Sequence, residues 1–147
     1  MTAPTTTVTP IYTASATASG DGRNGRSTSS DGVLDVELAI PTEMGGPGGP
    51  KTNPEQLFAA GYAACYHSAL KGVARTQKVA IADTAVIADV TLNRIGDAMQ
   101  LSVDLHVEMS GVDQAQGEKL ADLAHQRCPY SRAISGNVDV VIDVTTA

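Results

Sequence analysis

Aromatic side chains are scarce in this chain of 147 residues, which contains no tryptophan, one phenylalanine and four tyrosines. Leucine, valine, isoleucine and alanine must therefore fill most of the core of a folded domain. Cations are also few, with 10 lysine and arginine residues against 16 aspartate and glutamate residues and a net charge of −6. Because no cations cluster along the chain, we expect no general binding to nucleic acid and none to an anionic membrane surface.

Two further absences concern targeting and redox chemistry. No run approaches the ~18 consecutive apolar residues of a membrane span, and the N-terminus lacks a basic-then-apolar signal pattern, so we expect a cytoplasmic protein. The two cysteines, Cys65 and Cys128, are too few for the disulfide framework of a secreted domain. In a reducing compartment they are either two inert core thiols or a redox pair.

Alternation of apolar and polar residues predicts one α+β domain over residues 11–147, after a loose Thr/Pro-rich tail at residues 1–10. The predicted strands are residues 11–19, 26–29, 34–40, 85–93, 99–109 and 138–144, and the predicted helices are residues 55–77 and, capped by Asp113, residues 114–127. The resulting order, βββ-α-ββ-α-β, groups the strands instead of alternating them with helices. This indicates an α+β fold and not a doubly wound one.

The segment GGPGGP at residues 45–50 is predicted to be a shaped loop beside a site. A flexible linker is the alternative, but it would separate the opening strands from the helix on which they should pack. Pro54 and Glu55, preceded by capping residues, indicate the start of that helix. Because the helix is apolar nearly all round as far as Lys71, we expect it to be long, central and buried.

The two cysteines lie at different places on the predicted helices. Cys65 is midway along the central helix, where packing is the simpler role, and Cys128 ends the second helix, where exposed groups are common. As a pair they fit a two-step reaction in which one thiolate reduces a peroxide and becomes a sulfenic acid. The second thiol then condenses with the sulfenic acid to form a disulfide. Their separation along the chain does not show whether they meet in space, so both roles stay open.

A reactive thiolate also needs a cation beside it. Arg23 or Arg26, in and after a glycine-rich turn, could supply that cation, with Glu55 as the carboxylate that orients it. Solvated arginines, and a glutamate that serves only the helix dipole, are the simpler explanations.

The three histidines offer a metal site or a Cys–His hydrolase as alternatives. The histidines are His67, His106 and His125. No pair of them has a ligand spacing such as HxxxH, so we expect no zinc site. His67 is two residues beyond Cys65 on the same helix, so its side chain points to a different side.

Short motifs are spread between about residue 11 and residue 144. They are YTA at 12–14, ATA at 16–18, GRNG at 22–25, SSDGVL at 29–34, GGPGG at 45–49, TNPEQLFAAGY at 52–62, AC at 64–65, CPYS at 128–131 and GNVDV at 136–140. In these motifs the chain resembles the organic hydroperoxide resistance (Ohr) proteins of the OsmC/Ohr superfamily. The combination of TNPEQLFAAGYAAC with a distant CPYS is the most specific part of the resemblance.

The resemblance implies an OsmC/Ohr-like fold, an intertwined homodimer and a peroxidase without metal or cofactor. Its substrates would be organic hydroperoxides, including those of fatty acids, in preference to hydrogen peroxide, and a lipoylated protein would supply the reducing dithiol. By position, Cys65 matches the peroxidatic cysteine and Cys128 the resolving cysteine. Arg23 matches the arginine that stabilises the thiolate, and Glu55 the carboxylate that orients this arginine.

Two alternatives to this function stay open at the level of the sequence. One is an OsmC-like peroxidase of broader specificity, and the other is a non-catalytic ligand-binding dimer in which Cys65 is inert. The chain also departs from the family pattern at Lys51, where a small residue is more usual, and at His67, where an apolar residue is expected. His67 therefore leaves the polarity of the pocket undecided.

The spacing of Glu55 and Cys65 bears on how a site could be assembled. Ten residues of one straight helix correspond to about 15 Å of rise. Glu55 could not then hold an arginine against the Cys65 thiol of its own chain unless the helix breaks near Gly61. The sequence therefore predicts sites shared between two chains of the dimer.

Overall fold

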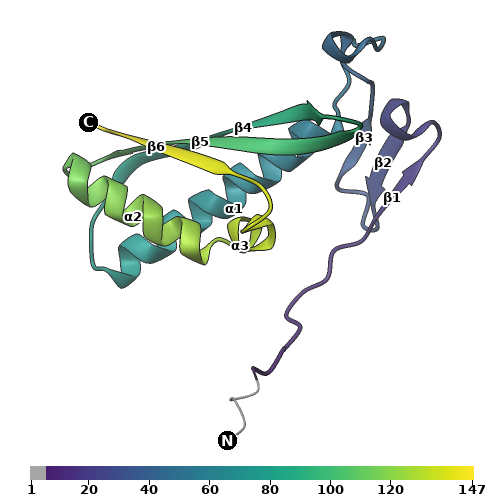
Figure 1. Cartoon of the computed structure of the whole chain (residues 1–147). Coiled ribbons are helices and arrows are strands. Elements are labelled where there is room, and N and C mark those ends of the chain that lie inside the picture. The colour runs from purple at the N-terminus through teal and green to yellow at the C-terminus, as the bar shows by residue number, and fades with distance from the viewer. Residues whose placement is uncertain (1–5) are drawn as a thin grey trace, which may run out of the picture. The chain divides into compact units, whose positions relative to one another are not determined.

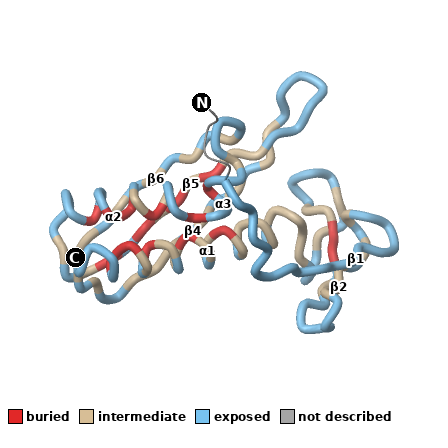
Figure 2. Tube along the Cα trace, turned by 90° about the horizontal axis from the view of Figure 1, so that it is seen from below, coloured by how far each residue is buried: buried red, intermediate tan, exposed pale blue. Residues whose placement is uncertain are grey.

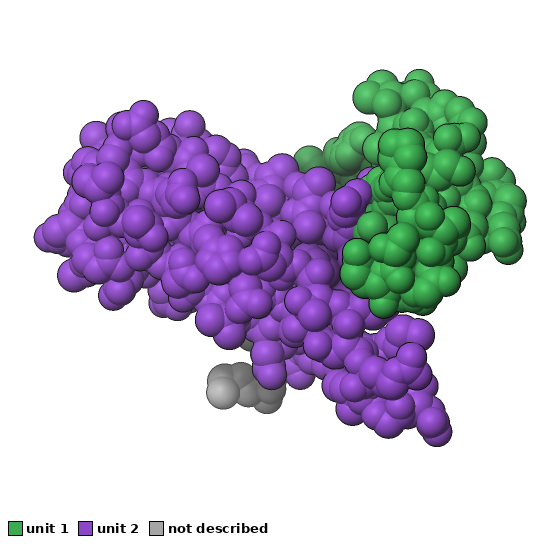
Figure 3. Space-filling view, turned by 90° about the horizontal axis from the view of Figure 1, so that it is seen from above, with its two compact units in different colours: residues 1–53 green, residues 54–147 purple. Residues whose placement is uncertain are grey.

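A computed structural model describes residues 6–147 of the chain and has the predicted α+β architecture (Figure 1). The elements are β1 (Ala16–Ser19), η1 (Gly22–Asn24), β2 (Arg26–Ser29), β3 (Asp35–Glu37), η2 (Thr42–Met44), α1 (Pro54–Thr76), β4 (Ala82–Ile95), β5 (Ala98–Ser110), α2 (Gln114–Arg127), α3 (Pro129–Ile134) and β6 (Val140–Thr146), where η marks a turn of 3₁₀ helix. The chain divides into two compact units, residues 1–53 and residues 54–147 (Figure 3), which are described separately. The assignment of residues 11–147 to one domain stays a prediction. Of the predicted tail, residues 1–5 lie outside the described residues, and residues 6–10 have no regular secondary structure.

The first unit is an antiparallel meander in the order β1-β2-β3. The sequence predicts that its first strand begins at Ile11, which is wrong, since β1 begins at Ala16. The cause is the partner strand, because β2 is four residues long and pairs only with residues 16–19 of β1. Ile11 is left 98% exposed. The third strand is also shorter than predicted, because the backbone after Glu37 leaves the ladder and Leu38 forms an isolated bridge with Thr52.

The GGPGGP segment is a folded loop, as predicted. The N–H of Gly46 donates to the Pro41 carbonyl at 3.0 Å, and the N–H of Gly48 donates to the Ile40 carbonyl at 3.0 Å. A Cβ atom on Gly46 would lie 2.2 Å from the Ile40 carbonyl oxygen, so only glycine permits this close approach. The location of the loop beside a site stays a prediction.

The second unit is a three-stranded sheet in the order β4-β5-β6, with α1 and α2 on one face (Figure 1). β4 and β5 form an antiparallel hairpin, whereas β5 and β6 are parallel, and the crossover between them contains α2 and α3. The predicted alternation along β5 is confirmed, because Val103, Leu105, Val107 and Met109 are all buried. The intervening residues form the other face of the sheet.

The boundaries of the second unit follow the sequence closely, with two differences. Asp113 caps α2 as predicted, accepting a hydrogen bond from the Gln116 N–H at 2.8 Å. The short helix α3 was not predicted; its first residue is Pro129, which is well suited to start a helix. The last strand begins at Val140 and not at Val138, because the Val138 N–H donates to the Ile134 carbonyl in the turn that ends α3.

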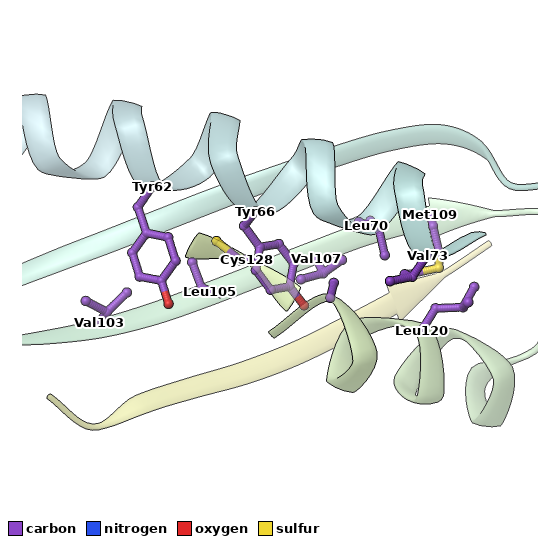
Figure 4. Packing of buried hydrophobic residues seen from close by; sticks show 11 residues of the cluster. Tyr62, Tyr66, Leu70, Val73, Val103, Leu105, Val107, Met109, Leu120 and Cys128 are labelled. Carbon is purple, nitrogen blue, oxygen red and sulfur yellow. The ribbon is translucent and has the colours of Figure 1, made fainter. Parts of the chain in front are cut away.

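The central helix α1 is continuous across Gly61 and packs one side against the sheet. Figure 4 shows Tyr62, Tyr66, Leu70 and Val73 projecting from that side, at the spacing of three or four residues that aligns side chains along a helix. Within one chain its burial is one-sided, and α1 also carries residues that are exposed (Figure 2). Within residues 6–147, no helix has both the length and the apolar character needed to cross a bilayer.

Candidate active site around Cys65 and Cys128

The two cysteines, far apart in the sequence, lie beside each other in the second unit. Both are free thiols, and the thiol of Cys65 on α1 is within hydrogen-bonding reach of the thiol of Cys128. Their burial is the reverse of the sequence-based expectation, because Cys65 is half-buried and Cys128 is fully buried. The reason is the fold around Cys128, which is the junction between α2 and α3 and is enclosed in the core beside Tyr66 (Figure 4).

The protonation of Cys65 depends on three features of its surroundings. Burial raises the pKa of the Cys65 thiol, and the neighbouring Cys128 thiol raises it further. The backbone N–H of Tyr130 opposes these effects by donating to the sulfur, which lowers the pKa. None of these main influences on the thiol is a cation, whereas a reactive thiolate needs one.

A buried polar network holds the segment that carries Cys128. The hydroxyls of Tyr62 and Ser131 are 2.6 Å apart, and Nδ1 of His125 is 2.9 Å from the same Ser131 oxygen. Ser131 is 2% exposed, so these bonds replace the water that its hydroxyl would otherwise bind. The network links α1, α2 and α3, and it thereby fixes the position of Cys128 and of the Tyr130 N–H. The sequence assigns no role to Tyr62 or Ser131, although both belong to the family motifs, and it offers His125 only as a possible metal ligand or hydrolase residue.

Three aromatic rings pack together near the Cys65 thiol and form an apolar wall. Two of them come from α1, on the N-terminal side of Cys65, and the third comes from α3. The ring centroids of Phe58, Tyr62 and Tyr130 are 5.9–6.1 Å apart in each pair. Gly61 allows this packing, because a Cβ atom there would lie 2.9 Å from the Tyr130 hydroxyl oxygen. The same tyrosine thus contributes its ring to the wall and its backbone N–H to the Cys65 sulfur.

Cys65 also lines a cavity of about 530 Å³. Its volume lies within the range of small-molecule sites. The lining residues are Cys65, Ser68, Ala69, Gly72, Arg75, Arg127 and Pro129.

The histidines have other partners. His67 lies outside this lining, and its Nε2 is 2.7 Å from the Thr84 hydroxyl oxygen on β4. His67 therefore points to a different side from Cys65, as predicted, and does not make this cavity polar. His106 bonds two aspartates and His125 bonds Ser131. Among residues 6–147, no group of three or more histidine, cysteine, aspartate or glutamate side chains is placed to hold a metal ion.

The two remaining predicted site residues lie in different units. Arg23 is in η1 of the first unit, and Glu55 is in the first turn of α1 in the second unit. Their roles toward Cys65 stay predictions. Arg26, the other arginine considered, is engaged by Asp35: its Nε donates to Oδ1 at 2.7 Å and its Nη2 to Oδ2 at 2.8 Å. Lys51 is exposed.

Several known proteins are similar to this chain in sequence and in fold. A family model described as OsmC-like protein matches residues 46–143. The chain is 47% identical over 133 residues to the organic hydroperoxide resistance protein of Xanthomonas axonopodis pv. citri, which covers 90% of this chain and 93% of that protein. It is also 47% identical over 141 residues to the organic hydroperoxide resistance protein OhrA of Bacillus subtilis, covering 92% and 96% of the two chains.

Solved structures give the same result. An organic hydroperoxide resistance protein from Legionella pneumophila superposes with a TM-score of 0.88 at 46% identity, covering 93% of this chain and 99% of that chain. One from Elizabethkingia anophelis superposes with a TM-score of 0.90 at 40% identity, covering 95% and 100%. The resemblance seen in the motifs is therefore confirmed over nearly the whole chain.

Proposed function

The chain belongs to the OsmC-like family, and on that premise we propose that it defends the cell by reducing organic hydroperoxides to alcohols. The observation that carries the proposal is the meeting of two free thiols, one of which, Cys65, lines a cavity. One thiol is half-buried and open to the cavity, and the other is buried directly beside it. This is the arrangement that a thiolate attack followed by disulfide formation requires.

The proposed reaction has three steps, each with its atoms and electrons balanced. The Cys65 thiolate attacks the distal peroxide oxygen, the O–O bond breaks, and the alkoxide takes a proton and leaves as the alcohol, while Cys65 becomes a sulfenic acid. The Cys128 sulfur then attacks the Cys65 sulfur, releasing water and forming a disulfide. A dithiol, which we propose to be carried by a lipoylated protein, reduces this disulfide and is itself oxidised to a disulfide.

Arg23 and Glu55 complete the proposed site. An arginine beside the Cys65 sulfur would offset the effect of burial, lower the pKa of the thiol and stabilise the departing alkoxide. Glu55 would orient that arginine through a charge-assisted hydrogen bond. Arg23 is proposed for this role because it matches the family's arginine position, which Arg26 does not.

The continuity of α1 supports a site shared by two chains of a homodimer. Because α1 does not break at Gly61, Glu55 and Cys65 of one chain are separated by about 15 Å of helix. Arg23 and Glu55 of one chain would then serve Cys65 of its partner. A cytoplasmic location fits the need for reduced thiols and a dithiol donor.

A stopped-flow comparison of an alkyl hydroperoxide with hydrogen peroxide, with a dithiol supplied, tests the proposal. We expect rapid loss of both thiols and much faster oxidation by the alkyl hydroperoxide. Similar rates for the two peroxides would favour an OsmC-like peroxidase of broader specificity. Retention of both thiols would favour a ligand-binding dimer and overturn the proposal.

A further inference from the structure

Two arginines converge at the far end of the cavity that contains the Cys65 thiol. Arg75 lies near the end of α1, and Arg127 is the last residue of α2. A Cβ atom built on Gly72 would lie 3.9 Å from Arg75 Nη2 and 4.0 Å from Arg127 Nη1. The two guanidinium groups therefore flank one point on α1, and both line the cavity.

The charges of these two groups are not neutralised by the protein. Within residues 6–147, neither arginine forms an ion pair with a carboxylate. Arg127 Nη1 donates to the Thr76 hydroxyl at 3.3 Å, which is a neutral acceptor and holds the guanidinium over α1. Both arginines are exposed, and their like charges repel each other, so an anion bound between them would relieve the repulsion. Such a pair is unexpected in a chain whose net charge is −6.

The part of the cavity between the Cys65 thiol and the arginines runs along α1 and is lined there by residues with small side chains. Cys65, Ser68, Gly72 and Arg75 follow one another at intervals of three and four residues, which places them along one side of α1. Ser68 and Gly72 project little from the helix, so they leave room along it. The guanidinium groups lie beside Gly72, seven residues beyond Cys65, so the stretch of the cavity between the thiol and the arginines is about 10 Å long.

We propose that Arg75 and Arg127 form an anion-binding subsite for the carboxylate at the far end of an extended hydroperoxide whose peroxide group lies at Cys65. The proposal deepens the function proposed above and rests on it for the role of the thiol. Guanidinium groups match carboxylates in shape as well as in charge, and they bind them through paired hydrogen bonds. A stretch of this length takes a chain of roughly eight carbon–carbon bonds. The subsite would make the protein prefer acids of about this length over their esters.

A protein with an acidic surface is the other kind of partner that could meet these cations. The shape of the site favours the small ligand, because the arginines line a hollow that leads to the thiol. Concave sites of this volume bind small molecules. Protein docking is therefore an outcome that the test must detect.

The main experiment compares one substrate with and without its charge. The probe is a linear nine-carbon acid whose hydroperoxide is at the end opposite the carboxylate, and its methyl ester is the reference. We expect kcat/KM for the acid to exceed that for the ester by about tenfold, and this ratio to fall to about one in the double variant Arg75→Gln/Arg127→Gln. A matched control is Arg132→Gln, which removes an equal charge from a residue that lines a neighbouring cavity but not this one. The control should keep the wild-type ratio.

Equal rates for acid and ester in the wild type, or an unchanged ratio in the double variant, would overturn the proposal. The pair Arg75→Lys/Arg127→Lys keeps both charges and should retain part of the preference, which tests the role of the paired hydrogen bonds. A double variant that keeps the ratio, but is slow only with an acidic protein as the reductant, would show a docking surface instead and would also overturn it.

A binding measurement separates this subsite from the proposed peroxidase function. Calorimetry with nonanoate and the Cys65→Ser protein requires no turnover. We expect binding that weakens about tenfold when Arg75 and Arg127 are also replaced by glutamine. Absence of binding would overturn the subsite even in an active peroxidase. Binding that depends on the arginines, in a protein that reduces no peroxide, would preserve the subsite and refute the peroxidase.

Discussion

The two units of the molecule differ in how fully their residues are buried (Figure 2). The second unit, residues 54–147, has a core that joins α1, α2 and β5 and contains fully buried side chains such as Leu70 and Leu105. In the described part of the first unit, residues 6–53, the buried apolar residues are Leu38 and Ala39, while Tyr12 and Val33 are more than 80% exposed. A three-stranded meander with so little core is marginal by itself.

This difference indicates which unit has enough core to fold independently and which unit has apolar residues suited to a contact with another surface. The second unit has the core expected of an independent folding unit, whereas the exposed apolar residues of the first unit are suited to being covered by another surface. That is the situation expected if the chain forms the proposed homodimer. The proposed chemistry is divided in the same way, because both thiols are in the second unit and Arg23 is in the first.

The largest effect should come from the thiols of the second unit. Cys65→Ser should abolish peroxide reduction, because no other group would accept the peroxide oxygen. Cys128→Ser should permit one oxidation and then stall, with over-oxidised Cys65 as the product. Mass spectrometry should find a Cys65–Cys128 disulfide in the oxidised wild type. Turnover by Cys65→Ser would refute the assignment of the attacking thiol.

The sequence predicts the fold of this protein more completely than it predicts the candidate site. Periodic patterns predicted most elements, because local rules govern them: β5 alternates between buried and exposed residues, and Asp113 caps α2. The start of β1 was predicted wrongly because it depends on the length of its partner strand. The short helix α3 has only six residues, too few for a periodic pattern to show.

The site was less accessible from the sequence because its members come from distant positions. The motifs identified Cys65 and Cys128, but only the fold brings their sulfurs together. The Tyr62–Ser131 hydrogen bond and the convergence of Arg75 and Arg127 are likewise tertiary contacts without a local signal. The sequence shows no cluster of cations along the chain, whereas the structure gathers these two arginines.

A second prediction compares equivalent truncations in the two units. Leu70→Ala removes a fully buried side chain from the core of the second unit and should lower the free energy of unfolding by about 2–5 kcal/mol. Leu34→Ala removes one that is 40% exposed in the first unit and should cost less than about 1 kcal/mol in the single chain. Urea unfolding measures both. If Leu34→Ala is as costly as Leu70→Ala, and the loss depends on protein concentration, the first unit is covered by a partner chain.

A third prediction tests whether the first unit supplies the cation. Arg23→Ala should raise the pKa of the Cys65 thiol, because burial would then act without an opposing charge. Attack on an alkyl hydroperoxide at pH 7 should slow by about tenfold for each unit of pKa. Arg26→Ala is the matched control and should have far less effect, since Asp35 engages Arg26. An unchanged pH–rate profile in Arg23→Ala would remove Arg23 from the mechanism.

A fourth prediction asks whether the Arg23 and the Cys65 of one proposed site come from different chains. Co-expression of Cys65→Ser and Arg23→Ala subunits gives mixed dimers that can be purified with two different tags. If sites are shared, one site carries both lesions and the other is intact, so about half of the activity should return. If each site lies within one chain, each keeps one lesion. A folded but inactive mixed dimer would therefore contradict shared sites without affecting the role of Cys65.

The smallest effects should come from exposed ion pairs, one in each unit, whose pH dependences differ in sign. On the outer face of the second sheet, His106 bonds Asp143 at 2.6 Å through Nδ1 and Asp89 at 2.8 Å through Nε2, and these carboxylates raise the pKa of His106 above its ordinary value of 6.5. A raised pKa in the folded state means that the stabilisation is complete below pH 6.5 and disappears as the pH rises through the folded-state value. In the first unit, the guanidinium of Arg26 lowers the pKa of Asp35 below 3.8, so that pair stabilises the fold at every pH above this value and fails only in acid.

Thermal unfolding between about pH 5.5 and pH 9 should separate the two pairs. The difference in stability between the wild type and His106→Gln should shrink steadily as the pH rises over this range. The difference between the wild type and Arg26→Gln should stay constant, because neither Arg26 nor Asp35 changes its charge there. Both differences should be small, since all the side chains involved are exposed and screened by solvent. A His106→Gln difference that does not change with pH would show that the histidine is neutral in the folded protein and donates a hydrogen bond to only one of the two aspartates.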